Sequence, residues 1–302
     1  MGSERGAKLQ LIAAVLIFGT IGLFRRGIAL PSGLIACARG LIGAAFLAVR
    51  AATLGHTPDR NVIRRNLARL ILSGACIGFN WILLFEAYNY TSIAVATLAY
   101  YMAPVIVIAV SPLLLHERVT RGRVLCVLLA LVGMVLVSGV ADGDAATGEP
   151  IGIALGLGAS VLYASVMLLN RTFKDVPVGD RTTVQLASAG LVLIPYVILA
   201  ERTSIALPDP KSAILLAVVA IVHTGAAYTL YFGGVGGLPA QTTALYSYID
   251  PMTAILLSSL LPGERLTPTG AVGAVLILGS TLLSEHMDRY LDRRGRRRGN
   301  GG

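Results

Sequence analysis

Residues 104–120 read PVIVIAVSPLLLHERVT, and residues 251–267 read PMTAILLSSLLPGERLT. The two stretches align without a gap at an offset of 147 residues. Positions that are identical in both copies at this offset include Gly78/Gly225, Phe85/Phe232, Tyr101/Tyr248, Pro104/Pro251, Glu117/Glu264, Arg118/Arg265 and Thr120/Thr267. This pattern indicates an internal duplication, in which each copy fills about half of the 302-residue chain.

The composition of the whole chain is typical of a membrane protein. Hydrophobic residues make up 55% of the chain and charged residues only 14%, whereas a soluble domain has about a quarter charged residues. The apolar blocks have roughly the length that crosses a ~30 Å hydrocarbon core as a helix. We therefore predict an all-α integral membrane protein with ten transmembrane helices. The predicted spans are 8–29, 31–51, 67–88, 92–114, 122–141, 151–171, 181–200, 211–233, 238–262 and 268–286.

Each copy of the repeat contains five predicted spans. Because five is odd, the second copy enters the membrane from the opposite side, so the repeats are inverted. We expect a first five-helix repeat over 1–145, an inverted second repeat over 146–288 and a basic tail over 289–302. Inverted repeats are a recurrent design of secondary transporters, because their two halves can expose one site to either side in turn.

Basic residues gather on the side of the N-terminus. Of the 25 Lys and Arg residues, 19 fall in segments on that side, five on the other, and Arg39 lies within a span. Since cytoplasmic loops carry the excess of Lys and Arg, we predict a multi-pass protein of the plasma (inner) membrane with both termini cytoplasmic. The expected partner of this side is anionic lipid. The Arg293–Arg298 segment has no interleaved aromatic residue, and no nucleic-acid partner is predicted.

In each copy a proline is followed thirteen residues later by a glutamate, as in Pro104 with Glu117 and Pro251 with Glu264. With the ten spans and two five-helix repeats, this chain resembles the drug/metabolite transporter superfamily, in particular its EamA-type branch. The resemblance covers nearly the whole chain. It implies a solute cavity between the halves, lined largely by the third, fourth, eighth and ninth spans. It leaves the solute open, because the family moves amino acids, nucleotide sugars, quaternary amines and other metabolites.

Two carboxylates lie within predicted spans, where a central charge costs about 2.5–3.5 kcal/mol on insertion scales. Asp250 lies near the middle of the ninth span, directly before Pro251, which frees a backbone carbonyl. Glu86 lies near the outer end of the third span. We predict both as proton-coupling candidates and Asp250 also as a solute ligand. The alternatives are a hydrogen bond from Asp250 to neighbouring backbone or helix, and a water-exposed interfacial Glu86.

Aromatic residues concentrate in the third, fourth, eighth and ninth spans. On a continuous ninth helix, Thr243, Tyr246 and Asp250 follow i, i+3 and i+7 and share one face. Aromatic faces beside a carboxylate suit a cationic or amphipathic solute, although an interfacial aromatic belt is the alternative for residues near helix ends. The residues predicted to bind the solute are Asn80, Trp81, Tyr101, Gln241, Thr243, Tyr246, Tyr248 and Asp250.

Arg39 is a further polar residue within a span, and the motifs of several enzyme classes are absent. For Arg39, pairing with a carboxylate or with backbone carbonyls is favoured over binding of a substrate anion. Phosphate-loop, zinc-protease, nucleophile-elbow and C-x-x-C motifs are absent from the sequence. No catalytic residue, cofactor or metal site is predicted. Without a phosphate-binding loop, ATP is not expected to be the energy source.

The sequence therefore predicts a secondary transporter that moves a small polar or cationic organic metabolite by alternating access, with export of an amino acid or amine favoured. A quaternary-ammonium or drug transporter of the same fold is the close alternative. A non-transporting membrane sensor or scaffold and a membrane-embedded lipid enzyme are further alternatives. The identity of the solute, its direction, the coupling ion and the oligomeric state, monomer or homo-oligomer, are not predicted.

Overall fold

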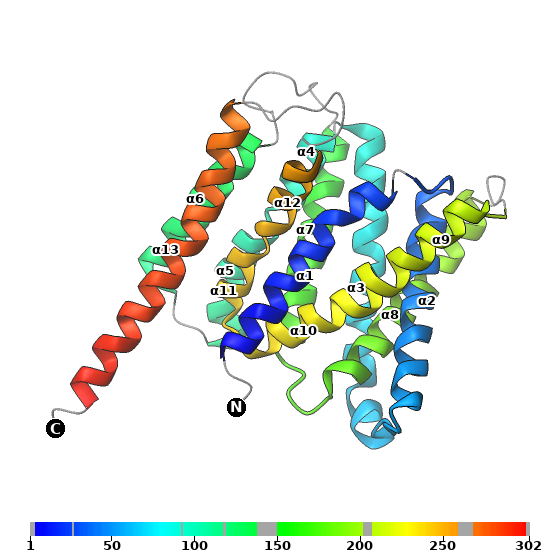
Figure 1. The fold of residues 1–302 in the computed structure, drawn as a ribbon, viewed down its shortest axis with the longest axis horizontal. Coiled ribbons are helices and arrows are strands. Elements are labelled where there is room, and N and C mark those ends of the chain that lie inside the picture. The colour runs from blue at the N-terminus through cyan, green and yellow to red at the C-terminus, as the bar shows by residue number, and fades with distance from the viewer. Residues whose placement is uncertain are drawn as a thin grey trace.

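The computed structural model of the chain is a bundle of helices that alternate in direction (Figure 1). It describes residues 4–25, 27–91, 93–116, 119–137, 150–201, 207–258 and 268–299. The first half contains α1 (Glu4–Arg25), α2 (Ser32–Thr53), α3 (Arg60–Tyr90), α4 (Ile93–Tyr100), α5 (Ala103–Leu115) and α6 (Arg121–Val137). The second half contains α7 (Pro150–Asn170), α8 (Val178–Tyr196), α9 (Pro210–Val218), α10 (Ala227–Gly237), α11 (Ala240–Tyr246), α12 (Ile249–Ser258) and α13 (Pro268–Gly299). Short π-helical segments over Val197–Glu201 and Val219–Ala226 extend α8 and join α9 to α10.

The described helices follow the ten predicted spans. Seven helical stretches in the described part of the chain are long and apolar enough to cross a membrane. They are Glu4–Arg25, Ser32–Thr53, Arg60–Ala87, Leu98–Leu115, Pro150–Asn170, Val178–Glu201 and Pro210–Gly237. The other three predicted spans correspond to α6, to α11 together with α12, and to α13, of which Pro268–Ser280 is apolar. These elements, with no strand among the described residues, confirm the all-α membrane fold class.

Large apolar side chains cover the outside of the bundle. Leu113 is 76% exposed, Leu199 is 82% exposed and Val275 is 69% exposed. In water such a surface would promote aggregation, whereas in a bilayer it contacts lipid tails that are equally apolar. The outer surface therefore fits the bilayer that the composition predicts.

The two halves pack on each other through exchanged helix partners. α1 packs on α10 and α12, while α7, its counterpart, packs on α3 and on α4 and α5. α2 packs on α8, and α6 packs along α13 at one edge of the bundle (Figure 1). Exchanged partners are what a twofold-related pair of repeats requires. The exact repeat boundaries at 145 and 288 stay predictions.

Aligned glycines allow these close approaches. A Cβ atom at Gly78 of α3 would lie 2.8 Å from the carbonyl oxygen of Ala189 in α8. At Gly225, its counterpart 147 residues later, a Cβ atom would lie 2.9 Å from the Phe46 ring in α2. Both contacts are closer than a Cβ atom tolerates, so a side chain at either position would push the helices apart.

The fourth helix of each half is interrupted at the same place. A turn over Tyr101 and Met102 separates α4 from α5, and a turn over Ser247 and Tyr248 separates α11 from α12. Pro104 and Pro251 follow in the first turns of α5 and α12, where a missing backbone N–H is tolerated. The repeated prolines therefore mark the start of a new helix in mid-bundle. The Glu117–Arg118 and Glu264–Arg265 pairs lie outside the described residues.

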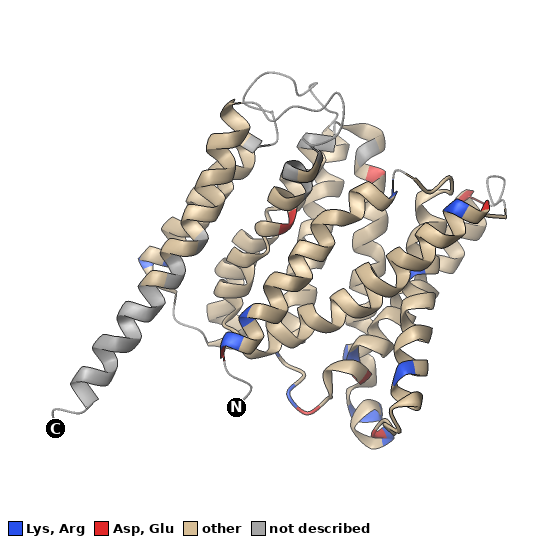
Figure 2. Cartoon of the chain, in the orientation of Figure 1, with Lys and Arg blue, Asp and Glu red and all other residues tan. Residues whose placement is uncertain are grey.

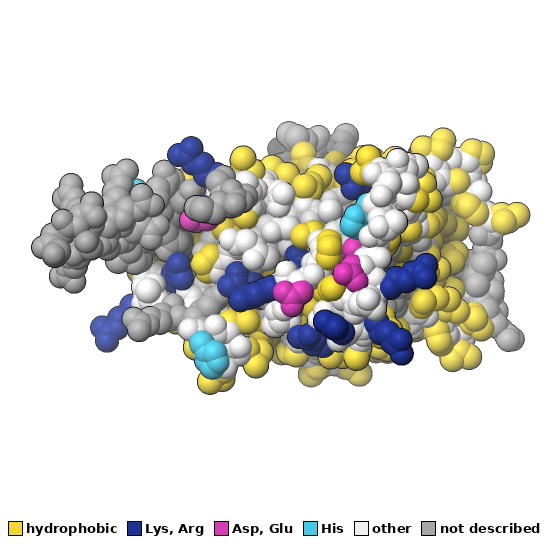
Figure 3. All heavy atoms as spheres, turned by 90° about the horizontal axis from the view of Figure 1, so that it is seen from below, with side chains coloured by type: hydrophobic (Ala, Val, Ile, Leu, Met, Phe, Trp, Pro, Cys, Tyr) yellow, Lys and Arg dark blue, Asp and Glu magenta, His cyan; other side chains and the backbone are white. Residues whose placement is uncertain are grey.

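Basic residues concentrate at one end of the bundle, where α1 begins and the connections after α2, α5 and α7 lie (Figure 2). We call this end the basic face. Figure 3 views it directly and shows Lys and Arg side chains spread over it, with fewer acidic ones between them. Asp59 stabilises the start of α3 here, since its Oδ1 accepts hydrogen bonds from the Asn61 and Val62 amides at 2.9 and 3.1 Å.

Candidate functional site

A cavity of about 560 Å³ lies inside the bundle, within the size range of small-molecule sites. Residues of both halves line it. They come from α1, α2, α3, α4, α7, α10 and α12, from the connection between α1 and α2, from the turn after α4 and from the π-helical segment before α10. The four spans that the family resemblance implies all contribute, and the first, second and sixth spans contribute as well.

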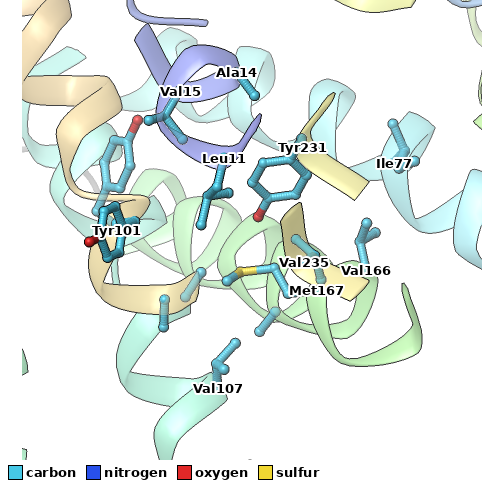
Figure 4. Packing of buried hydrophobic residues seen from close by; sticks show 14 of the residues in the cluster. Leu11, Ala14, Val15, Ile77, Tyr101, Val107, Val166, Met167, Tyr231 and Val235 are labelled. Carbon is cyan, nitrogen blue, oxygen red and sulfur yellow. The ribbon is translucent and has the colours of Figure 1, made fainter. Parts of the chain in front are cut away.

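The cavity is separated from the basic face by a packed core. Its α1 lining runs from Phe18 to Arg25, the half of α1 remote from that face. Nearer the basic face, Leu11, Ala14 and Val15 of α1 belong to one buried cluster with residues of α7 and α10 (Figure 4). The labelled partners in this core include Val166, Met167, Tyr231 and Val235.

Aromatic rings form much of the cavity wall. Tyr100 of α4 stacks on Tyr163 of α7, with ring centroids 5.3 Å apart, and the Tyr163 and Tyr231 hydroxyls lie 3.0 Å apart. On another part of the wall, the ring of Tyr228 lies 5.1 Å from Phe18 and 6.1 Å from Trp81. Such a wall offers π-faces to a cation or to an apolar side chain.

Asp250 brings a carboxylate into this wall. It lies in the first turn of α12, directly after the helix interruption, and Tyr101 donates a hydrogen bond from its hydroxyl to Oδ2 at 3.1 Å. The other carboxylate oxygen has no partner among the described residues. The interruption therefore places an acidic group, held by a tyrosine of the opposite half, at the cavity surface.

Arg39 brings the opposite charge. It lies on α2, and its guanidinium carbon is 4.4 Å from the centroid of the Trp81 ring, a cation–π distance. Its Nε donates to the Thr224 hydroxyl at 2.9 Å. Sequence reasoning favoured a carboxylate or backbone carbonyl as the partner of Arg39. Within the described part of the chain its partners are instead an aromatic ring and a hydroxyl.

The predicted solute ligands fall into two groups. Asn80, Trp81, Tyr101 and Asp250 line the cavity. Asn80 also donates from Nδ2 to the carbonyl of Ala159 at 2.7 Å, which fixes the facing of its amide. These four residues come from α3, from the turn after α4 and from α12, and the fold brings them together.

The remaining predicted ligands, Gln241, Thr243, Tyr246 and Tyr248, are buried in or just after α11 and do not line the cavity. Gln241 accepts a hydrogen bond from Arg123 Nη1 at 2.9 Å. The prediction that Thr243, Tyr246 and Asp250 share one helix face assumed a continuous ninth helix. The turn over Ser247 and Tyr248 ends that register, and of this group only Asp250 reaches the cavity.

Glu86 lies in a separate cavity of about 410 Å³. Tyr196 donates a hydrogen bond to its Oε1, and Asn89 donates to its Oε2 at 3.2 Å. Glu201 lines the same cavity and accepts hydrogen bonds from the Gly33 and Leu34 amides at 2.8 and 2.7 Å, which caps the start of α2. Both glutamates thus join the two halves at the end remote from the basic face.

Several lining residues were not predicted as ligands. Tyr100, Tyr228 and Tyr231 lie in the fourth and eighth spans, where aromatic residues concentrate, but they were not predicted individually as ligands. Tyr163 and Phe18 lie in the sixth and first spans, which carried no such signal. Among the described residues, no cluster of three or more His, Cys, Asp or Glu is arranged to hold a metal ion.

Comparisons with known proteins agree with this architecture. The sequence model of the EamA-like transporter family matches residues 6–139 and, a second time, residues 150–285. An uncharacterized transporter of Bacillus subtilis, YxxF, is 25% identical over 280 residues, which cover 92% of this chain and 89% of that protein. Protein PecM of Dickeya dadantii is 28% identical over 236 residues, which cover 76% of this chain and 77% of that protein.

A solved crystal structure has the same fold. It superimposes with a TM-score of 0.85 at 20% sequence identity, over 96% of this chain and 99% of the other. At this identity the likeness concerns the fold alone. The family match, which covers both halves of the chain, carries the functional conclusion.

Proposed function

Because the chain belongs to the EamA-like transporter family and is a multi-pass membrane transporter, we propose that it is a secondary carrier for a small polar or cationic organic solute. Export of an amino acid or a related amine is the favoured activity. The observation that supports this most is the cavity between the halves, where Asp250 and an aromatic wall lie together. A carboxylate beside π-faces binds an ammonium group by charge and by cation–π attraction.

The proposed mechanism is alternating access. The packed core around Leu11 and Val15 closes the cavity toward the basic face, while the cavity lining reaches Arg25 at the other end of α1. Reciprocal packing of the halves supports an exchange in which the second half adopts the first half's arrangement and the closed end opens. The π-helical segments and interrupted helices are the places where backbone could adjust during that exchange.

We propose the plasma (inner) membrane as the location, with the basic face and both termini cytoplasmic. The concentration of Lys and Arg at that end supports this orientation, since cytoplasmic loops carry such an excess. Anionic lipid headgroups would then contact the basic face.

Coupling to a proton gradient is part of the proposal. Asp250 is the stronger candidate because it lies in the central cavity, while Glu86 lies in the separate outer cavity. A facilitative carrier, driven by the gradient of the solute alone, is the alternative. The sequence carries no phosphate-binding loop to supply ATP-driven transport.

A quaternary-ammonium or drug transporter is the second candidate, and the aromatic wall favours it, since tyrosine and tryptophan rings bind quaternary ammonium groups. A non-transporting sensor and a lipid enzyme gain no support from the cavity. Flux into proteoliposomes of the full-length protein decides between the candidates. The panel contains labelled amino acids, primary amines and tetraethylammonium, with protein-free liposomes as the control. Transport of at least one class is expected, and no flux of any organic solute contradicts the proposal.

A further inference from the structure

Arg39 is a nearly buried charge with incomplete partners. Only 8% of its surface is exposed. A guanidinium carries five N–H donors. Here Nε donates to Thr224, while the two terminal nitrogens have no hydrogen-bond partner in the described structure. None of the described carboxylates forms an ion pair with it.

This arrangement is costly for a residue that serves packing alone. A buried charge destabilises a protein unless it is paired, and neither the Trp81 ring nor the Thr224 hydroxyl neutralises a guanidinium. Arg39 lines the central cavity, so the missing counter-charge can come from a bound solute. The planar fork of the guanidinium fits a carboxylate with two parallel hydrogen bonds.

Asp250 supplies the complementary charge in the same cavity. Arg39 belongs to α2 in the first half, and Asp250 belongs to α12 in the second. Each charged group has a hydrogen bond to a neutral side chain of the other half. The Arg39 guanidinium donates to Thr224 of the second half, and the Asp250 carboxylate accepts from Tyr101 of the first half. Hydrogen bonds thus position both charged groups, and neither group forms an ion pair with a side chain among the described residues.

We propose that the solute is zwitterionic, with an anionic carboxylate that binds Arg39 and an ammonium group that binds Asp250. The inference rests on the proposed function and narrows its solutes from small polar or cationic molecules to molecules that carry both charges. Each half of the transporter then holds one charge of the solute. A solute with only a cation leaves the buried guanidinium unpaired and binds less tightly for that reason.

Matched ligand sets test this on the wild-type protein. One set contains leucine, isoamylamine and isocaproate, which share a side chain and carry both charges, only the cation or only the anion. A second set, δ-aminovalerate, amylamine and valerate, separates the two charges along the chain. Tetraethylammonium serves as the quaternary cation. Binding is measured by titration calorimetry on the full-length protein in detergent micelles.

In at least one set, the member with both charges should bind roughly tenfold or more tighter than either single-charge member, as one charge-assisted hydrogen-bonded contact implies. Arg39→Gln should lower the affinity for the zwitterion more than the affinity for the amine, and so remove this advantage, because the carboxylate then has no guanidinium to bind. Arg50→Gln, an exposed change of the same type on the same helix, should alter neither.

The outcomes separate the inference from the proposed function. If amines or tetraethylammonium bind and the zwitterions bind no better, the inference is wrong and a cation transporter stands. If a folded Arg39→Gln protein loses amine and zwitterion equally, the inference is again wrong. If no member of either set nor tetraethylammonium binds the wild-type protein, both fail. Should Arg39→Gln not fold, the wild-type comparison alone decides.

Discussion

The hydroxyl of Tyr248 donates a hydrogen bond to the main-chain carbonyl of Tyr101 at 3.3 Å. Tyr101 is the residue that aligns with Tyr248 in the first repeat, 147 residues earlier. The hydroxyl of Tyr101 in turn donates a hydrogen bond to the carboxylate of Asp250. The two tyrosine rings lie 6.4 Å apart, so the interruptions of the two fourth helices meet inside the bundle. This contact ties the acidic group of the second half to the backbone of the first.

Tyr248→Phe should destabilise the protein by about 1 kcal/mol, because the buried carbonyl of Tyr101 loses a donor that water cannot replace. The measurement is thermal unfolding of the full-length protein in detergent. Tyr90→Phe is the matched control, since Tyr90 is 41% exposed at the end of α3. Equal unfolding temperatures for the two variants would show that the contact between the repeats contributes nothing.

Asp250→Asn should lower transport of an ammonium solute roughly tenfold or more, because an amide offers no charge to the cation. Flux into proteoliposomes measures this effect. Asp59→Asn is the control, since asparagine caps a helix as well as aspartate does. The same assay under imposed pH gradients, with Glu86→Gln alongside, identifies the proton carrier. If transport by Asp250→Asn and by Glu86→Gln remains as proton-dependent as transport by the wild type, neither Asp250 nor Glu86 carries the proton.

Gly40→Ala should destabilise the bundle by about 1–3 kcal/mol, the range for overpacking. A Cβ atom at Gly40 would lie 2.9 Å from the backbone nitrogen of Gly190, so α2 and α8 would have to separate. Gly279→Ala in α13 meets no atom within 4 Å and should be neutral or stabilising. Thermal unfolding and flux are compared for both. Loss of stability in both variants would indicate a general intolerance of substitution rather than a close helix contact.

Cysteine labelling should place Thr57 and Leu207 on opposite sides of the membrane. Both are exposed, Leu207 at 96%, and the connections that hold them precede α3 and α9. The native Cys37, Cys76 and Cys126 are buried and should stay unlabelled. An impermeant maleimide added to intact cells should modify Leu207→Cys, and should modify Thr57→Cys only after permeabilisation. Labelling of both from one side contradicts the inverted arrangement, and the reverse pattern contradicts the cytoplasmic basic face.

Much of the fold was predictable because it depends on local properties of the chain. A helix of about 20 apolar residues is the form in which a segment crosses a bilayer, so composition predicts the spans. α2 (Ser32–Thr53) and α7 (Pro150–Asn170) lie within two residues of the predicted spans 31–51 and 151–171. α3 begins at Arg60, before its predicted span 67–88, and α13 continues to Gly299, beyond its predicted span 268–286. Pro104 and Pro251 lie in the first turns of α5 and α12, but each of their spans was predicted as one continuous helix, so the turns before these prolines were not predicted.

The site depended on relations that no local pattern carries. Sequence reasoning selected Asp250, Tyr101, Trp81 and Asn80, since polar and aromatic residues at membrane depth are costly or unusual. It also selected four residues around α11 that the turn at Ser247 and Tyr248 separates from the cavity.

By itself, then, the sequence determined an all-helical membrane protein with ten spans and a duplicated order of helices, because hydropathy and repetition are properties of the chain alone. Only the tertiary structure decided which side chains face the cavity. Arg39 and Asp250 are more than 200 residues apart, and they line one cavity only because helices of both halves cross beside it. Crossing geometry arises from close contacts such as Gly40 on Gly190, between residues that a linear pattern does not connect.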